Sequence, residues 1–278
     1  MTESAGLPPD VPLNKPSPAR MYDYFLGGFH HLAIDRQAAE AAIRVYPDTP
    51  LLARVNRAFL RRVVTFLLAQ GITQFLDLGS GLPTVGCTHE VASRRTPDRR
   101  VVYVDIDPVT VEYGRTILQG TASAAMLQAD VRQIEEILKH VVTQRLLDLR
   151  QPVGVLLLAV LHFVPGDAEA QELVRVLREA IVPGSYVAIS HASIAHVPRE
   201  GVRQLGPIYA RSTDPGTTRS RAQIEPFFTG LDLVPPGLVY VPCWQPEGPD
   251  DLFVDQPERS LLLGGVGRKP AAASDAVA

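Results

Sequence analysis

The stretch Phe75-Leu-Asp77-Leu-Gly79-Ser-Gly81-Leu-Pro-Thr84 decides the fold of this chain. An apolar run ends in the carboxylate of Asp77 and passes directly into a turn that holds Gly79 and Gly81. Glycine adopts positive φ readily and lets a ligand approach the backbone closely. A strand that enters such a turn before a helix is typical of the first unit of a nucleotide-binding α/β fold.

The carboxylate of Asp77 distinguishes between two classes of ligand for this turn. A carboxylate repels a pyrophosphate, whereas it attracts a ligand that carries an ammonium and a sulfonium group. Thr84 also stands where the dinucleotide fingerprint has its third glycine or alanine. The turn therefore favours S-adenosylmethionine over a nicotinamide dinucleotide.

The next two apolar runs also end in acidic residues. The β-branched stretch that begins at Val101 closes with Asp105 and Asp107. A carboxylate at the end of the second parallel strand suits hydrogen bonding to ribose hydroxyls. A third stretch ends in Asp130 and Val131, where an adenine amino group could bind.

The fourth strand is expected in the apolar stretch at residues 153–163, as in a parallel sheet covered on both faces. This stretch holds Ala159 and ends with His162 and Phe163. With an ordinary pKa near 6.5, His162 is a candidate general base for a hydroxyl or amine acceptor. The alternative is a histidine that packs beneath the cofactor and has a structural role only.

In this order and spacing the motifs resemble those of the class I S-adenosylmethionine-dependent methyltransferases, over roughly residues 57–268. Three further stretches, at residues 18–28, 56–62 and 230–239, are similar to a largely actinobacterial family of S-adenosyl methyltransferases, formerly catalogued as a domain of unknown function.

This resemblance implies a role for each motif in binding the cofactor S-adenosyl-L-methionine. It assigns the methionine end to Asp77, Gly79 and Gly81, the ribose to Asp105 with Asp107 beside it, the adenine to Asp130 and Val131, and the floor beneath the methyl group to Ala159. It leaves the methyl acceptor open.

The alternation of strands and helices predicts an α/β fold with a doubly wound, seven-stranded, mostly parallel sheet. The resemblance makes this the Rossmann-like methyltransferase fold, whose last strand is antiparallel. Strands are expected in residues 231–241 and 261–266, and a polar excursion without regular structure in residues 196–222. Helices are expected near residues 84–95, 108–119, 133–148 and 168–181.

The chain divides into four expected parts. They are a mobile N-terminus at residues 1–16, a helical lid at residues 17–56, a methyltransferase domain at residues 57–269 and a mobile tail at residues 270–278. A helix is expected to start near residue 56, after a break at residues 47–50.

Tyr22 and Tyr24 in the lid precede the pair Gly27-Gly28. Two tyrosines before a glycine hinge could close over the sulfonium by cation–π attraction. The alternative is a helix that docks by its aromatic face and ends at the glycines.

Acceptor contacts are expected from residues that follow the fifth strand. The fold often places them in the segment before the sixth strand, which holds Tyr209, Arg211 and Arg219, and His191 lies at the same rim. No metal site is expected, because the adjacent residues His30 and His31 point apart on any regular element.

Composition limits the partners. The chain has 27 basic and 30 acidic residues, which does not suggest a nucleic-acid-binding surface. Two isolated cysteines, no apolar run of about 18 residues and no signal-peptide core predict a cytoplasmic protein without membrane contact. The expected substrate is a small molecule methylated on oxygen or nitrogen; the oligomeric state stays open.

Two other functions compete with this hypothesis. A non-catalytic module could keep the S-adenosylmethionine pocket for regulation or scaffolding, and the sequence does not separate it from an enzyme. A nicotinamide oxidoreductase is opposed by Asp77 and by Thr84.

Overall fold

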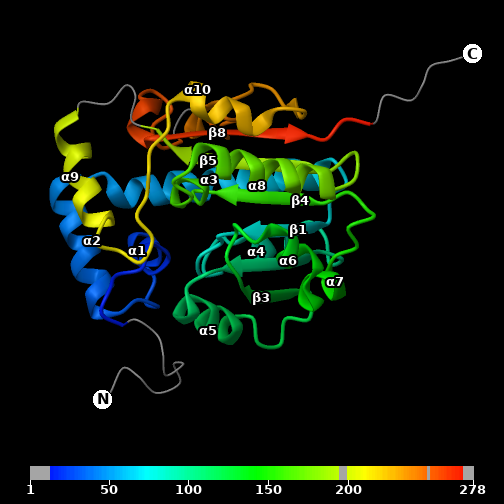
Figure 1. The fold of residues 1–278 in the computed structure, drawn as a ribbon, viewed down its shortest axis with the longest axis horizontal. Helices are drawn as coiled ribbons and strands as arrows, with labels where there is room; N and C mark the ends of the chain where they lie inside the picture. The colour runs from blue at the N-terminus through cyan, green and yellow to red at the C-terminus, as the bar shows by residue number, and fades with distance from the viewer. Residues whose placement is uncertain (1–12, 194–198, 249–250, 272–278) are drawn as a thin grey trace, which may run out of the picture.

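The structure is a computed structural model that describes residues 13–193, 199–248 and 251–271. A mixed sheet of eight strands forms its centre (Figure 1), in the order β3-β2-β1-β4-β5-β8-β6 with β7 also paired to β8. The strands are β1 (Gln74–Leu78), β2 (Arg100–Asp105), β3 (Ala124–Gln128), β4 (Gly154–Leu158), β5 (Tyr186–Ala192), β6 (Asp232–Leu233), β7 (Val239–Tyr240) and β8 (Leu262–Arg268).

Strands β1 to β5 pair in parallel, and β8 runs antiparallel to β5, β6 and β7. The predicted doubly wound, mostly parallel fold with an antiparallel last strand is therefore confirmed. The expected sixth strand is divided into β6 and β7, because the intervening Pro235-Pro236 pair cannot donate ladder hydrogen bonds.

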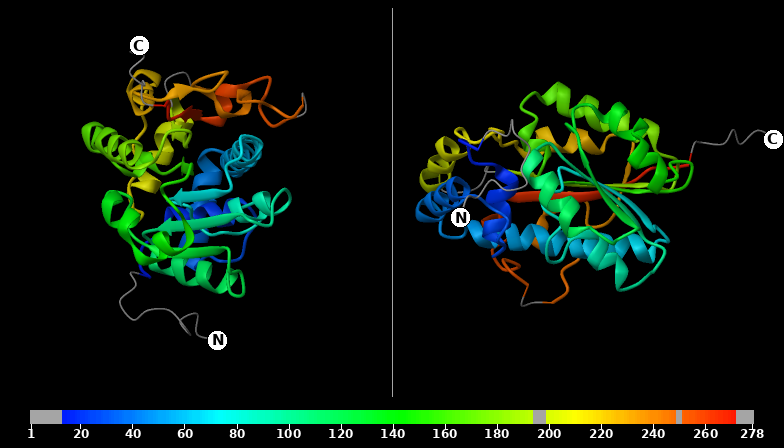
Figure 2. Two further views of the ribbon diagram at one scale, coloured as in Figure 1. Left: turned by 90° about the vertical axis from the view of Figure 1, so that its right-hand side faces the viewer. Right: turned by 90° about the horizontal axis from the view of Figure 1, so that it is seen from below.

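Helices cover both faces of the sheet, as two views at right angles show (Figure 2). One face packs on α3, α4 and α5, and the other on α6, α7, α8 and α10. The helices are α1 (Pro18–Phe25), α2 (Ala33–Val45), α3 (Thr49–Ala69), α4 (Thr88–Ser93), α5 (Pro108–Ile117), α6 (Ile134–Lys139), α7 (Val141–Leu146), α8 (Asp167–Ala180), α9 (Arg199–Tyr209) and α10 (Arg221–Ile224).

Two helices differ from the expectation: α3 begins earlier than predicted, and α9 lies in a segment where no helix was predicted. Helix α3 begins at Thr49, with Pro50 in its first turn, where the missing proline N–H is tolerated. The expected boundary between residues 56 and 57 thus falls inside one continuous helix. The polar segment 196–222 contains α9, whose Leu205 and Ile208 pack against α1 and α2.

Helices α1, α2 and α9 gather at the carboxyl ends of the parallel strands (Figure 1). Their contact is a small apolar cluster built around Met21, Phe25 and Ala39. This cluster is separate from the two large ones that flank the sheet. The N-terminal helices therefore stand over the edge where ligands bind in open α/β sheets. Within the described residues, no helix is long and apolar enough to span a membrane.

The expected mobile ends lie mostly outside the described residues. Of residues 13–16, which are described, Pro16 accepts a hydrogen bond through its carbonyl from the Thr213 N–H at 3.0 Å. This hydrogen bond joins the N-terminal segment to the segment that follows α9.

Candidate functional site

A cavity of about 550 Å³ opens at the carboxyl ends of the parallel strands, between the sheet, α1, α3 and α9. The loops after β1, β2, β3 and β4 contribute to it. Most of the predicted site residues line this one cavity: Tyr22, Asp77, Gly79, Gly81, Asp105, Asp107, Asp130, Val131, Ala159, His162 and Tyr209.

The glycine turn has the geometry that its sequence predicts. Gly79 has φ +64° and Gly81 has φ +61°. A Cβ atom at Gly79 would lie 2.1 Å from Val160 Cγ2, so glycine lets this turn contact the loop after β4. Ala159, in that same loop, has φ +55°, which is rare for a residue with a side chain and is concentrated at functional sites.

A carboxylate and a guanidinium face the cavity near this turn. Asp77 is buried and accepts a hydrogen bond from Thr88 Oγ1 at 2.6 Å. Burial raises the pKa of Asp77 to about 6, against the opposing effects of Thr88 and of the Arg57 charge. Arg57 also lines the cavity, and its Nε atom is buried without a hydrogen-bond partner among the described residues. Sequence reasoning did not single out Arg57, although it lies in one of the family-like stretches.

The carboxylate of Asp105 is held in place by two backbone groups. The Gly81 N–H donates to Oδ2 at 2.9 Å, and the Asp107 N–H donates to Oδ1 at 3.0 Å. Burial raises the pKa of Asp105 to about 7 in spite of these bonds, and the charges of Asp107 and Asp214 act in the same direction as burial. Asp105 is therefore a fixed acceptor at the end of β2.

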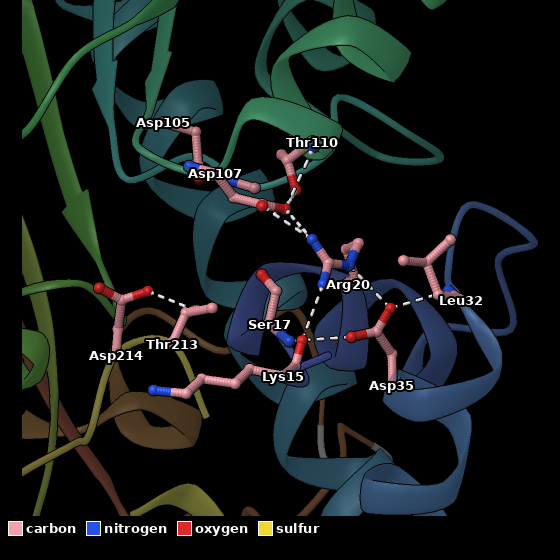
Figure 3. Close-up of polar contacts among 11 residues, drawn as sticks. Lys15, Ser17, Arg20, Leu32, Asp35, Asp105, Asp107, Thr110, Thr213 and Asp214 are labelled. Atoms are coloured by element: carbon pink, nitrogen blue, oxygen red, sulfur yellow. Dashed lines mark hydrogen bonds and ion pairs between the residues drawn. The ribbon is translucent and has the colours of Figure 1, made fainter. Parts of the chain in front are cut away.

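The carboxylate of Asp107 is already engaged within the protein (Figure 3). Both of its oxygens accept from Arg20 Nη1 at 2.7 Å. One of them also accepts from the N–H and the hydroxyl of Thr110, so that Asp107 is the N-cap of α5. The side chain of Asp107 thus binds Arg20 and α5, and the residue also lines the cavity; its cofactor role stays a prediction.

Asp130 lies at the end of β3 together with Arg132, and both line the cavity. Partial burial works to raise the pKa of Asp130, but the hydrogen bonds from Arg132 outweigh it and lower that pKa. Asp130 is thus a charged acceptor beside Val131.

His162 lies in a short 3₁₀ turn after β4, residues Leu161–Phe163, and lines the cavity. Its Nδ1 is buried without a partner among the described residues, which leaves Nε2 as the ring nitrogen that could reach a ligand. Burial lowers the pKa of His162 to about 3, and the charges of His191 and Arg219 add to this effect. His162 does not keep its ordinary pKa and is neutral near pH 7.

The predicted residues His191, Tyr24 and Arg211 do not line the cavity. His191 is buried, with Nε2 2.9 Å from Arg219 Nη1 and Nδ1 2.8 Å from the Ala192 carbonyl oxygen. Because arginine can only donate, Nε2 accepts and Nδ1 carries the proton. The Tyr24 hydroxyl lies 3.4 Å from a Glu40 carboxylate oxygen, on an exposed surface, and Arg211 is exposed.

Arg219, also a candidate acceptor contact by its place before the sixth strand, is bound within the protein and does not line the cavity. It is buried and donates to the carbonyl oxygens of Leu161 and Val164 and to Asp167. These bonds fix the turn that carries His162. A lone arginine in a polar segment gave no signal of this role.

A chain of hydrogen bonds joins α1 to the loop after β4. Asn56 Nδ2 donates to the Tyr22 hydroxyl at 3.2 Å, and Asn56 Oδ1 accepts from Ser190 Oγ at 2.7 Å. Ser190 Oγ in turn accepts from the Ala159 N–H at 2.9 Å. Tyr22 is thereby tied to Ala159, while its ring lies 5.7 Å from the Arg57 guanidinium carbon.

These groups fit S-adenosylmethionine part by part. Carboxylates suit its ammonium and ribose hydroxyls, the unpaired Arg57 suits its carboxylate, and the glycine turn admits its amino-acid end. Among the described residues, no cluster of three His, Cys, Asp or Glu side chains is arranged to hold a metal ion.

Comparisons with known proteins agree with this chemistry. A family model described as S-adenosyl methyltransferase matches residues 4–270. A candidate methyltransferase from Thermobifida fusca is 39% identical, with a TM-score of 0.87 over 96% of this chain and 100% of that chain. A DUF574 family protein from Streptomyces avermitilis is 35% identical, with a TM-score of 0.84 over 92% of this chain and 98% of that chain.

More distant structures share the fold alone. The N-methyltransferase NodS from Bradyrhizobium japonicum, solved with S-adenosyl-L-homocysteine, is 13% identical, with a TM-score of 0.51 over 90% of this chain and 99% of that chain. No curated protein matches the chain. The extent of the family match and the two close structures show that the chain belongs to the S-adenosyl methyltransferase family and is an S-adenosylmethionine-dependent methyltransferase.

Proposed function

We propose that this enzyme transfers a methyl group to an oxygen or nitrogen atom of a small molecule. The observation that carries the proposal is a single cavity that is lined both by the acidic strand ends and by His162, Phe163 and Tyr209. A cavity of this size holds small ligands rather than a polymer. When bound, S-adenosylmethionine supplies an electrophilic methyl group.

The chain's own residues then have separable tasks. Asp77 would bind the ammonium group, Asp105 the ribose hydroxyls, and Asp130 with Val131 the adenine. Arg57 would bind the carboxylate of the methionine part, because its charge acts on Asp77 and its buried Nε has no hydrogen-bond partner among the described residues. Tyr22 would pack over this end and keep water out.

The acceptor would lie in the part of the cavity bounded by Phe163, Leu205 and Tyr209. Apolar walls favour a largely apolar acceptor. The neutral His162 can accept a hydrogen bond or a proton from the acceptor's hydroxyl or amine. Alignment of this nucleophile with the methyl group is the main catalytic requirement, since proximity alone contributes about 7–11 kcal/mol in favourable cases.

Residues 17–56 would act as a lid over this cavity rather than as an independent domain. Segments of about 40 residues rarely bury enough surface to fold alone. The pair Gly27-Gly28 would serve as its hinge. A Cβ atom at Gly28 would lie 2.2 Å from Asp23 Oδ1, whereas one at Gly27 would meet no atom within 4 Å.

Incubation of the protein with methyl-labelled S-adenosylmethionine and a pool of small molecules tests the function. Label should pass to a product with a new O-methyl or N-methyl group, and Asp105→Asn should slow its appearance. Tight binding of S-adenosylmethionine without transfer to any of a broad set of acceptors would favour a non-catalytic binding module. Absorbance of a bound nicotinamide would favour an oxidoreductase.

The assignment of Arg57 is tested with two ligands that differ in the amino-acid part. Arg57→Met should weaken S-adenosylhomocysteine by about 1.5–3 kcal/mol, as for a hydrogen bond to a charged group. It should leave 5′-methylthioadenosine, which lacks the carboxylate, unchanged. Equal losses for both ligands in calorimetry would instead mean that Arg57 only supports the shape of the cavity.

A further inference from the structure

Arg20 joins three elements through one buried guanidinium (Figure 3). It is 1% exposed and lies on α1. Its Nε donates to Asp35 on α2 at 2.7 Å, and its Nη1 donates to Asp107 at the start of α5, also at 2.7 Å. Asp35 further accepts from the N–H groups of Ser17 and Leu32, at 2.8 and 2.7 Å. Both N-terminal helices are thus fixed to the beginning of α5.

The same contact reaches the cavity through one more hydrogen bond. Arg20 holds the side chain of Asp107, and the Asp107 N–H donates to Asp105 Oδ1 at 3.0 Å. Asp105 and Asp107 line the cavity, whereas Arg20 does not. Arg20 therefore acts on the cavity only through its neighbours.

Charge gives Arg20 a second effect on this site. Asp107 and Asp105 are both buried, and the charge of Asp107 disfavours the ionised form of Asp105. The charge of Asp214, in the segment after α9, also disfavours the ionised form of Asp105. Arg20 compensates the charge of Asp107, and an uncompensated buried charge is strongly unfavourable.

We propose that Arg20 is a positioning residue for ribose recognition, through which docking of α1 and α2 and binding of the cofactor strengthen each other. The proposal rests on the ribose role given to Asp105 in the proposed function. Linkage is reciprocal, so a ligand that needs a correctly placed Asp105 must also stabilise the docked helices.

Arg62 offers a matched control for the loss of a buried arginine. It is 5% exposed and donates to the carbonyl oxygens of Trp244 and Val241, at 2.9 and 2.7 Å. It does not line the cavity. Arg62→Met should therefore lower the stability of the protein without changing the affinity for ligand.

Calorimetry with adenosine and with S-adenosylhomocysteine tests the proposal at the level of affinity. Arg20→Met should weaken both ligands by the same factor, about 5- to 50-fold, because both carry the ribose. Arg20→Lys should recover part of this loss by keeping a cation beside Asp107. Unchanged adenosine affinity in Arg20→Met, or an equal loss in Arg62→Met, would overturn the proposal.

Asp107→Asn provides a second test that avoids removing a large side chain. Asparagine is as good an N-cap as aspartate, so α5 should keep its start while the charge that pairs with Arg20 is lost. In the unsubstituted protein, saturating adenosine should slow hydrogen exchange in residues 17–35. In Asp107→Asn this added protection should be largely lost.

The outcomes separate this inference from the function on which it rests. Persistent protection of residues 17–35 in Asp107→Asn would mean that adenosine orders these helices by direct contact, and the role of Arg20 would be rejected. Failure of the unsubstituted protein to bind adenosine or S-adenosylhomocysteine would reject the assigned ribose site itself. Arg57→Met gives the opposite pattern, with loss confined to S-adenosylhomocysteine.

Discussion

The carboxylate of Asp105 is oriented before any ligand arrives, because two backbone N–H groups already bind it. We expect Asp105→Asn to weaken S-adenosylhomocysteine by about 1.5–3 kcal/mol, since a hydrogen bond to a charged acceptor is lost. Calorimetry at pH 8, where the carboxylate is ionised, measures this loss. Asp98→Asn, at an exposed position, is the control and should bind like the unsubstituted protein. Equal affinities for both variants would remove Asp105 from the ribose site.

His162 makes a prediction about the pH dependence of the reaction. Its pKa of about 3 means that it contributes no acidic limb between pH 5 and 8. A ring with this pKa is a weak base at neutral pH but can still accept a hydrogen bond, so with an acceptor in hand His162→Gln should lower kcat if the ring orients the acceptor. The KM for S-adenosylmethionine should change little. A retained kcat with a lowered Tm would identify His162 as a packing residue.

The glycine turn offers a prediction at the scale of one element. Gly79→Ala adds the cost of φ +64° and a Cβ atom 2.1 Å from Val160 Cγ2. Gly120→Ala adds strain at φ +83° but meets no atom within 4 Å. The first change should abolish detectable binding of S-adenosylhomocysteine and destabilise the protein by more than the ~1–2 kcal/mol expected of the second. Similar unfolding midpoints for the two variants would contradict the close contact.

At the scale of elements, the acidic strand ends could be predicted because each is a local pattern of an apolar run and a carboxylate. The start of α3 could not, since the proline at position 50 reads equally as a break or as a first helical turn. Helix α9 was also missed. Its few apolar residues are covered by α1 and α2, and a contact between distant segments leaves no local pattern.

For the whole molecule, two buried carboxylates link stability to pH. The pKa of Asp77 is raised to about 6 and that of Asp105 to about 7, against an ordinary value of 3.8. Between about pH 4 and 7 these two carboxyls hold more protons in the folded protein than in the unfolded chain, so their contribution to stability falls as pH rises. The buried His162 and His191, whose pKa values are lowered to about 3 and about 4, act in the opposite direction. We therefore expect the carboxyl effect as a difference between variants: the Tm at pH 5.5 minus the Tm at pH 8, without ligand, should be smaller in Asp105→Asn than in the unsubstituted protein.

The same two carboxylates also predict how a bound ligand changes the dependence of stability on pH. Ribose hydroxyls and an ammonium group bind the ionised forms, so S-adenosylhomocysteine should raise the Tm more at pH 8 than at pH 5.5. Thermal unfolding at both pH values, with and without ligand, measures the difference. A larger effect at the lower pH would mean that protonated carboxyls bind the ligand.

The molecule also shows which parts of a binding site a sequence can reveal. The strand ends that meet the cofactor follow one another along the chain, so their order was readable. Three arginines act through contacts with residues that are remote in sequence: Arg20, Arg57 and Arg219. In the sequence, such an arginine cannot be distinguished from one on a solvated helix face. The ion pair of Asp107 could not be predicted for the same reason, because its partner Arg20 precedes it by 87 residues.

That separation has a consequence for how the chain matures on the ribosome. At about 5–20 residues per second, Arg20 is synthesised roughly 4–17 s before Asp107 can meet it. Helix α9, which covers the same N-terminal cluster, is made later still. Helices α1 and α2 must therefore wait for Asp107 and for α9, which are the last of their native partners to be made.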